Sequence, residues 1–139
     1  MEGATFILKH VGVTNRFRFF LQDENDKTIL TGQIREVKPM CLDEIKWIRK
    51  VAIKDSFYER VKKEEGYVYI LRANDAHELG RGNIHSTEEL MNEEIELVKQ
   101  YAIDADVVDE TPEEERVRAR DFVVEESSKL LEEMGLEYS

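Results

Sequence analysis

The residues of this chain that could do chemistry are one cysteine and three histidines. Cys41 would act as a nucleophile only if a nearby base lowered its pKa. It falls instead on an apolar pattern with three- and four-residue steps, which predicts a buried side chain that fills space. His10, His77 and His85 lack the spacing of zinc ligands, among themselves or with Cys41, and we expect them on the surface or in turns. We therefore predict no catalytic residue.

Two short segments could bind ions, but each has a simpler interpretation. Segment 104–110 carries three aspartates and one glutamate, yet it lacks the glycine and the length of a calcium loop. We interpret it as a solvated connector. Segment 80–82 is Gly-Arg-Gly, which could form an anion-binding nest of backbone amides. Because Gly82 recurs as Gly32 fifty residues earlier, a bulge or bend in a strand is favoured, and we predict no metal and no cofactor.

A basic surface in the first half of the chain could grip single-stranded nucleic acid by charge and aromatic stacking. Basic residues recur at three- and four-residue steps on the first predicted helix, and two arginines accompany a phenylalanine on a strand. The residues of this surface are Arg16, Arg18, Phe20, Lys46, Arg49, Lys50 and Lys54. The second predicted helix has Glu93, Glu94 and Glu96 in the corresponding region, so the surface is not repeated.

The charge of the chain is acidic and unevenly distributed. Its 139 residues include 20 Lys and Arg against 31 Asp and Glu, for a net charge of -11. Residues 1–66 hold 13 basic and 11 acidic side chains, whereas residues 67–139 hold 7 and 20. Strong acidity disfavours non-specific nucleic-acid binding, which depends on phosphate neutralisation. It also suggests an acidic decoy that occupies the basic site of a partner.

Composition and the N-terminal sequence indicate in which cellular compartment the protein works. Apolar residues make up 41% of the chain, enough for a core, and a single cysteine excludes a disulfide scaffold and fits a reducing compartment. Glu2 and Lys9 are out of place in a signal peptide, and no window approaches a membrane span. We expect a cytoplasmic protein without membrane contact.

An internal repeat with a period of fifty residues organises the chain. Aromatic pairs recur in similar form, such as Phe17 and Phe19 with Tyr67 and Tyr69. Several residues are followed by the identical residue fifty positions later: Val11, Leu21, Gly32, Ile34, Glu44, Ile45, Ala52 and Ile53. The pattern predicts a first copy over 1–54, a second over 55–109, and an extension over 110–139 with no counterpart.

Each copy is predicted to form strands followed by one helix. The alternation of Phe17, Phe19 and Leu21 with polar residues indicates a half-buried strand, and turn residues 23–27 lead into a return strand over 28–31. The corresponding segments of the second copy are 67–71, 74–75 and 77–79. Further short strands are expected over 6–8, 57–58 and 107–108.

The helices have clear signals at their first turns and along their buried faces. Pro39 suits a first helical turn, and Ser86 with Glu89 predicts a capping box. The expected buried stripe of the first helix is Cys41, Leu42, Ile45, Ile48 and Ala52. That of the second helix, which should end near Tyr101, is Leu90, Met91, Ile95, Val98 and Ala102.

These residues resemble the YegP-like domain family over about residues 4–108. The resemblance rests on Phe17-x-Phe19-x-Leu21, Asn25, Ile29-Leu30-Thr31 and a helix around Ile45-x-x-Ile48. Members are small and often tandem, and have no established activity. The resemblance implies β-β-β-α-β units, two of which share one sheet and swap their last strands. This chain departs from the family at its hairpins, in segment 32–35, and at Glu44 and Glu94, where the family usually has glycine.

The extension over 110–139 is predicted to be a helix. Residues 111–114 form a capping box with proline at the first helical position, and Gly135 is a natural stop. We expect this helix to cover the sheet face that carries Phe20, Val68 and Ile70. Its apolar band is too broad for one face, which leaves surface for another chain. The candidate partner-binding residues are Val117, Phe122, Val124, Leu130 and Leu131.

We thus predict one α+β domain of two fused repeats around a shared antiparallel sheet, with helices packed on it and a C-terminal helix. The predicted function is a non-enzymatic binding or assembly module that acts through protein–protein contacts, with homodimerisation as its simplest form. Nucleic-acid binding is the alternative, and an acidic decoy is the third hypothesis.

Overall fold

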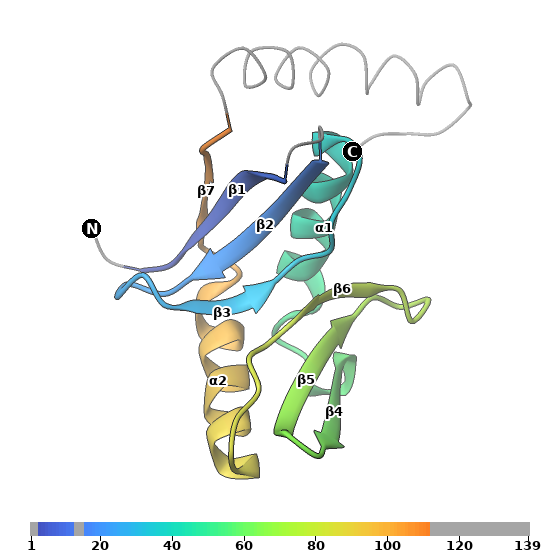
Figure 1. Ribbon diagram of the computed structural model, residues 1–139, viewed down its shortest axis with the longest axis vertical. Helices are drawn as coiled ribbons and strands as arrows, with labels where there is room; N and C mark the ends of the chain where they lie inside the picture. The colour runs from blue at the N-terminus through green and yellow to red at the C-terminus, as the bar shows by residue number, and fades with distance from the viewer. Residues whose placement is uncertain (1–2, 13–15, 112–139) are drawn as a thin grey trace.

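Both halves of the chain contain three strands followed by one long helix (Figure 1). The computed structural model describes residues 3–12 and 16–111. The first half contains β1 (Thr5–Val11), β2 (Arg16–Gln22), β3 (Thr28–Thr31) and α1 (Lys38–Val51). The second contains η1 (Asp55–Phe57), β4 (Tyr58–Lys63), β5 (Gly66–Arg72), β6 (Glu78–Arg81), α2 (Glu88–Tyr101) and β7 (Asp106–Asp109). The predicted α+β class is confirmed.

All the strands belong to one sheet, in the order β4-β5-β6-β3-β2-β1-β7. Every neighbouring pair is antiparallel except β1 and β7, which are parallel with Phe6 beside Val107. The expectation of a wholly antiparallel sheet is therefore wrong at this edge. Parallel strands cannot be joined by a hairpin and need a long connection, and here the segment from β2 to α2 lies between β1 and β7. The halves meet at β3 and β6 through the single pair Thr31 and Arg81.

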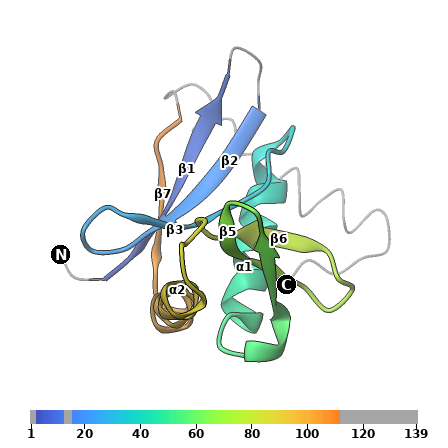
Figure 2. The same ribbon diagram turned by 60° about the horizontal axis from the view of Figure 1, so that its bottom comes forward.

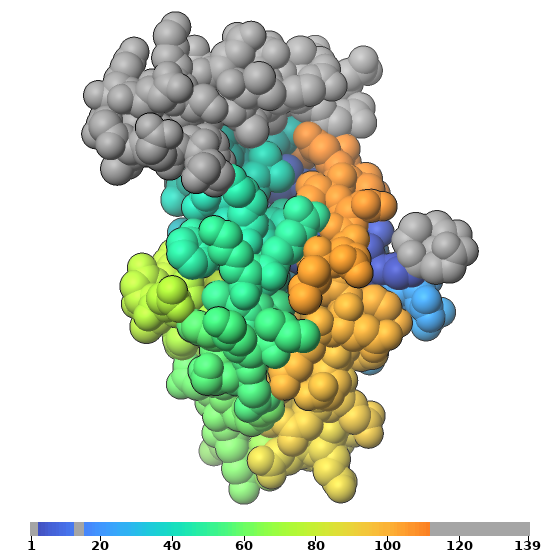
Figure 3. Space-filling view, turned by 180° about the vertical axis from the view of Figure 1, so that it is seen from behind, coloured from blue at the N-terminus to red at the C-terminus, as the bar shows by residue number. Residues whose placement is uncertain are grey.

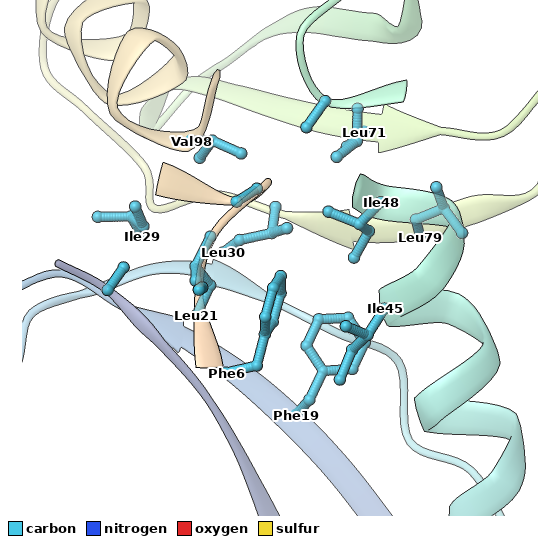
Figure 4. Packing of buried hydrophobic residues seen from close by; sticks show 14 of the residues in the cluster. Phe6, Phe19, Leu21, Ile29, Leu30, Ile45, Ile48, Leu71, Leu79 and Val98 are labelled. Atoms are coloured by element: carbon cyan, nitrogen blue, oxygen red, sulfur yellow. The ribbon is translucent and has the colours of Figure 1, made fainter. Parts of the chain in front are cut away.

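Both helices cover the same face of the sheet (Figure 2, Figure 3). Helix α1 contacts β2 of its own half and β6 of the other, and α2 contacts β5 and β3. Each helix therefore bridges the seam between the halves. Phe6, Phe19, Leu21 and Leu30 meet Ile45, Ile48, Leu71, Leu79 and Val98 in one core, as Figure 4 shows. One continuous core makes the two halves a single folding unit.

The glycines after β3 and β6 allow aromatic rings to cross the backbone. A β-carbon on Gly82 would lie closer than 3.0 Å to the Tyr69 ring, and one on Gly32 would lie equally close to the Phe19 ring. Tyr69 is fully buried, and its hydroxyl donates a hydrogen bond to the Ile29 carbonyl in the other half. The sequence predicted a strand bulge or bend at Gly82. The structure gives another reason for glycine at this position, namely the close approach of an aromatic ring.

Several local predictions are corrected by the structure. Thr87, not Ser86, caps α2, because its hydroxyl accepts the amide of Leu90 at 3.1 Å. Leu90 is 43% exposed rather than buried, since it lies in the first turn, away from the sheet. Phe57 belongs to the short helix η1, and the strand that follows extends to Lys63. Pro39 stands in the first turn of α1 as predicted.

The outer face of the sheet is largely buried in the second half. Val68 and Ile70 are 3% and 6% exposed, and Phe20 is half-buried. Ile70 is flanked across the strands by Glu59 and Arg81, long side chains whose stems cover apolar surface. The predicted C-terminal helix and its five candidate partner-binding residues lie outside the described residues.

Candidate binding pocket

A cavity of about 440 Å³ lies between α1 and the connection from β5 to β6. Figure 3 shows the tip of that connection, in lime green, beside α1, in teal. Because α1 packs against β6, the hairpin of the second half stands opposite a helix of the first. Residues three, four and seven apart share one face of α1, which supplies half of the wall. The lining residues are Met40, Asp43, Glu44, Trp47, Ala73, Asn74, Asp75, His77 and Leu79.

Glu44 is the buried polar group of this cavity, with only 5% of the residue exposed. Its Oε2 accepts a hydrogen bond from Nη2 of Arg35 and lies 2.8 Å from Nε2 of His77. The same His77 nitrogen lies 3.0 Å from Arg35 Nη2. Arginine only donates, so this nitrogen either donates to Glu44 or accepts from Arg35. The other carboxylate oxygen, Oε1, has no hydrogen-bond partner.

The rim of the cavity is apolar and acidic. Met40 is 45% exposed and Trp47 is 37% exposed. The Lys50 ammonium lies 5.0 Å from the centroid of the Trp47 ring. Asp75 is exposed, and its Oδ1 accepts the His77 amide at 3.0 Å, which holds the tip of the hairpin. The cavity therefore combines apolar walls, an aromatic ring and carboxylates.

The corresponding carboxylate on α2 is fully hydrogen-bonded. Glu94 is 2% exposed, and its Oε1 accepts the Asn83 amide at 3.0 Å. Its Oε2 accepts the Asn83 side-chain amide at 2.8 Å, and His85 Nε2 lies 3.2 Å from Oε1. Within the described residues, only Glu44 has a buried carboxylate oxygen without a partner. The two related positions differ in whether a carboxylate oxygen is left without a hydrogen-bond partner.

Cys41 lies beside this site but is not a nucleophile. The thiol is buried, as predicted. Burial first, and then the Glu44 carboxylate, raise its pKa to about 12. A thiol with that pKa is protonated at neutral pH and fills space in the core.

The histidines and the acidic segment are placed differently from the sequence prediction. His10 lies within β1 against the Phe17 ring, with 5.6 Å between centroids. His85 has only 14% of its side chain exposed, because it pairs with Tyr67 beside Glu94. Both are partly exposed but lie in a strand or a strand-like bridge rather than in a turn, whereas His77 does lie at a hairpin. Segment 104–110 contains the edge strand β7 rather than a connector alone. No group of three or more possible metal ligands occurs in 3–12 and 16–111.

The seven residues of the predicted basic surface are not brought together on one face. Arg16, Arg18 and Phe20 alternate with the core residues of β2 and so lie on the face opposite the helices. Lys46, Lys50 and Lys54 belong to α1 or directly follow it.

Two of the arginines in that predicted surface are engaged within the fold. Arg18 Nε donates to the Gly32 carbonyl at 2.7 Å. Arg49 donates to the Ala105 carbonyl, and its guanidinium lies 5.8 Å from the centroid of the Phe6 ring.

The last described residue, Thr111, is held in place at the start of α1. The buried Lys38 ammonium donates to Asp109 Oδ2 at 2.7 Å and to the Thr111 hydroxyl. Thr111 is 2% exposed. The chain beyond it therefore begins from a fixed point.

Sequence reasoning missed the cluster of Glu44, Arg35 and His77. One signal was present, since a glutamate inside an otherwise apolar helical stripe needs a polar partner. The partner itself was not visible, because His77 reaches Glu44 across the seam from thirty-three residues away.

Comparison with known proteins places the chain among uncharacterised relatives. No protein-family model matches it. A UPF0339 protein encoded 5′ of the ptx operon in Stutzerimonas stutzeri is 31% identical over 94 residues, which is 67% of this chain and 85% of the relative. A UPF0339 protein of Bordetella pertussis is 30% identical over 107 residues, which is 76% of this chain and 95% of the relative.

Solved structures agree with the fold. The solution structure of yegP from E. coli, described as a protein of unknown function, has a TM-score of 0.75 and 25% identity. It is covered over 96% of its length by 80% of this chain. A UPF0339 protein of Shewanella oneidensis has the same TM-score at 18% identity, covered over 94% of its length. The resemblance to the YegP-like family is confirmed. Among the described residues, no helix is long and apolar enough to cross a membrane.

Proposed function

Because the chain belongs to the UPF0339 family, whose E. coli member is described as a protein of unknown function, we propose a function from its own surface. The protein is a non-enzymatic binding module that acts through protein–protein contacts. The observation that carries this proposal is the cavity between α1 and the β5–β6 connection. It joins an exposed tryptophan and methionine to a buried carboxylate.

This combination suits an anchor of a protein interface. Tryptophan is enriched among residues that dominate binding energy, and methionine adapts to varied partners. A cavity with apolar walls and a few polar groups is also the usual form of a ligand site. The protonated state of the Cys41 thiol supports binding over covalent catalysis. We place this function in the cytoplasm, since the thiol is free.

The predicted C-terminal helix is a second proposed contact, through Val117, Phe122, Val124, Leu130 and Leu131. Thr111, anchored by Lys38, supports it by giving the extension a fixed start. A second copy of the chain is its simplest partner.

We also infer that the domain consists of two fused copies, over 1–54 and 55–109. Equivalent features recur fifty residues apart in support. Phe17 bridges Arg35 as Tyr67 bridges His85. A further pair is the left-handed backbone of Asp26 and Ala76.

Two other functions remain alternatives. Nucleic-acid binding would use Lys50 and Lys54 on the helical side or Arg16 on the other, because the sheet separates them. Retardation in a gel at low salt that disappears at high salt would support it. An acidic decoy would act through residues 67–139, which hold 7 basic and 20 acidic side chains.

The deciding experiment is comparative capture from lysate with matched variants of the full chain. We expect Trp47→Ser to lose partners that the wild type and Leu90→Ser both retain. Leu90 is the control because it is a similarly exposed apolar residue on α2.

The double variant Val124→Glu/Leu131→Glu tests the C-terminal helix separately. We expect light scattering to show a smaller mass for it than for the wild type. If all variants capture the same proteins, neither surface is the interface and the proposed function is wrong.

A further inference from the structure

We propose that the cavity beside Trp47 receives an arginine side chain of a partner protein, whose guanidinium donates to Oε1 of Glu44. This inference rests on the proposed function and names the chemistry of its partner. Guanidinium combines positive charge, several N–H donors and a planar face that stacks on aromatic rings. The cavity offers a complement to each of these three properties.

The N–H donors are matched by the free oxygen of Glu44. Arg35 and His77 both approach Oε2, which leaves Oε1 buried without a partner. Leaving a buried acceptor unsatisfied costs free energy, and a ligand that donates to it recovers this energy on binding. Arg35 Nε is also buried without a partner, but Arg35 is not among the lining residues of the cavity. The open group among the lining residues is therefore an acceptor, which favours a donor as ligand.

The related site on α2 shows that this free oxygen is not imposed by the fold. Glu94 occupies the equivalent helical position and has both oxygens hydrogen-bonded by Asn83. Gln33 stands in the first half where Asn83 stands in the second, fifty residues on, and no hydrogen bond from it to Glu44 satisfies Oε1. The lining of this cavity includes Glu44, which has the free oxygen, and does not include Glu94.

The charge of the cavity selects a cation. Its nine lining residues include Asp43, Glu44 and Asp75, and none is lysine or arginine. The Lys50 ammonium lies 5.0 Å from the centroid of the Trp47 ring, so this indole does take part in cation–π contact. An arginine of the partner would stack on the opposite face of the ring or replace Lys50. Arginine is favoured over lysine because its plane can stack on this ring while an edge donates to the carboxylate.

Trp47 is the only tryptophan of the chain, so its fluorescence reports on the site directly. The probe is acetyl-Gly-Arg-Gly-amide, compared with the peptide in which citrulline replaces arginine. Citrulline keeps the length and planar shape of the side chain, but a carbonyl oxygen replaces one nitrogen, so it has three N–H donors instead of five and carries no charge. We expect the arginine peptide to cause a saturable change in Trp47 fluorescence at about 0.15 M salt, where long-range electrostatic attraction is screened. The dissociation constant should be on the order of 1 mM, and about tenfold weaker or more for citrulline.

Three variants test the carboxylates of the cavity, one of them as a control on α2. Glu44→Gln should weaken arginine binding about tenfold or more, whereas Glu94→Gln should leave it unchanged. Asp43→Asn is a second test should Glu44→Gln fail to fold, and we expect about a threefold loss from this exposed rim charge.

The outcomes separate this proposal from the proposed function. Equal binding of the two peptides, or no saturable change with either, overturns the arginine site. If Trp47→Ser still loses captured partners in that case, the binding module stands with another ligand. If Glu44→Gln binds the arginine peptide as tightly as the wild type and Trp47→Ser captures the same partners as the wild type, both the arginine site and the binding module are overturned.

Discussion

Replacement of Gly82 by alanine should destabilise the domain through its effect on Tyr69. The added β-carbon would lie closer than 3.0 Å to two atoms of the Tyr69 ring and 2.7 Å from Glu94 Oε1. The ring cannot move easily, because it is fully buried and its hydroxyl is bonded to the Ile29 carbonyl. Overpacking of this kind costs about 3 kcal/mol.

A smaller opposing effect comes from the unfolded chain. Gly82 has no left-handed backbone, so alanine restricts the unfolded state and recovers about 1 kcal/mol. The expected net loss for Gly82→Ala is about 2 kcal/mol, which corresponds to a fall in Tm of about 6–10 °C for a domain of this size. Thermal unfolding followed by circular dichroism measures it.

A double-mutant cycle identifies the cause. Tyr69→Leu is itself destabilising, but in its background Gly82→Ala should cost much less, with a coupling of about 1 kcal/mol or more. Gly12→Ala is the control, because nothing lies within 4 Å of its β-carbon and only its φ of +70° opposes the change. A Tm for Gly82→Ala within about one degree of wild type, or additive effects in the cycle, would refute the reasoning.

Three further predictions concern a turn, an ion pair and a buried lysine. Ala76 has a φ of 69°, so Ala76→Gly should raise stability by about 0.5 kcal/mol in chemical denaturation. Hydrogen bonds from Arg60 and Lys99 lower the pKa of Asp55 to about 2 from its usual 3.8. The stability that Asp55 adds is complete above its usual pKa and lost as the pH falls toward 2. The stability difference from Asp55→Asn should therefore vanish in acid titration. Lys38→Met should cost about 3 kcal/mol, because it leaves a carboxylate without its buried partner. A melting temperature equal to wild type would contradict this last prediction.

Local patterns were enough to predict most of the elements. The alternation of Phe17, Phe19 and Leu21 produced β2, and each of the three is buried. Helical spacing likewise placed Ile45 and Ile48 in the core. These predictions succeed because periodicity depends only on neighbours along the chain.

What the sequence could not predict depends on contacts between the halves. Leu90 fits the helical stripe, yet it is 43% exposed whereas its neighbour Met91 is 1% exposed, a difference that helical spacing alone does not predict. Glu44 was noted only as a departure from the family pattern. Its role required knowing that His77 of the other half would stand opposite α1. Pairings across the seam obey no local period, so sequence patterns do not specify them.

The pairing of β7 with β1 has a consequence for biosynthesis. Thr5 and Asp106 lie side by side, although about a hundred residues separate them in the chain. At translation rates of about 5–20 residues per second, β1 waits roughly 5–20 s for its neighbour. During that time its outer edge offers free backbone hydrogen-bonding groups to any other nascent strand. The order of strands in the sheet thus leaves this edge of β1 open to aggregation until β7 emerges from the ribosome.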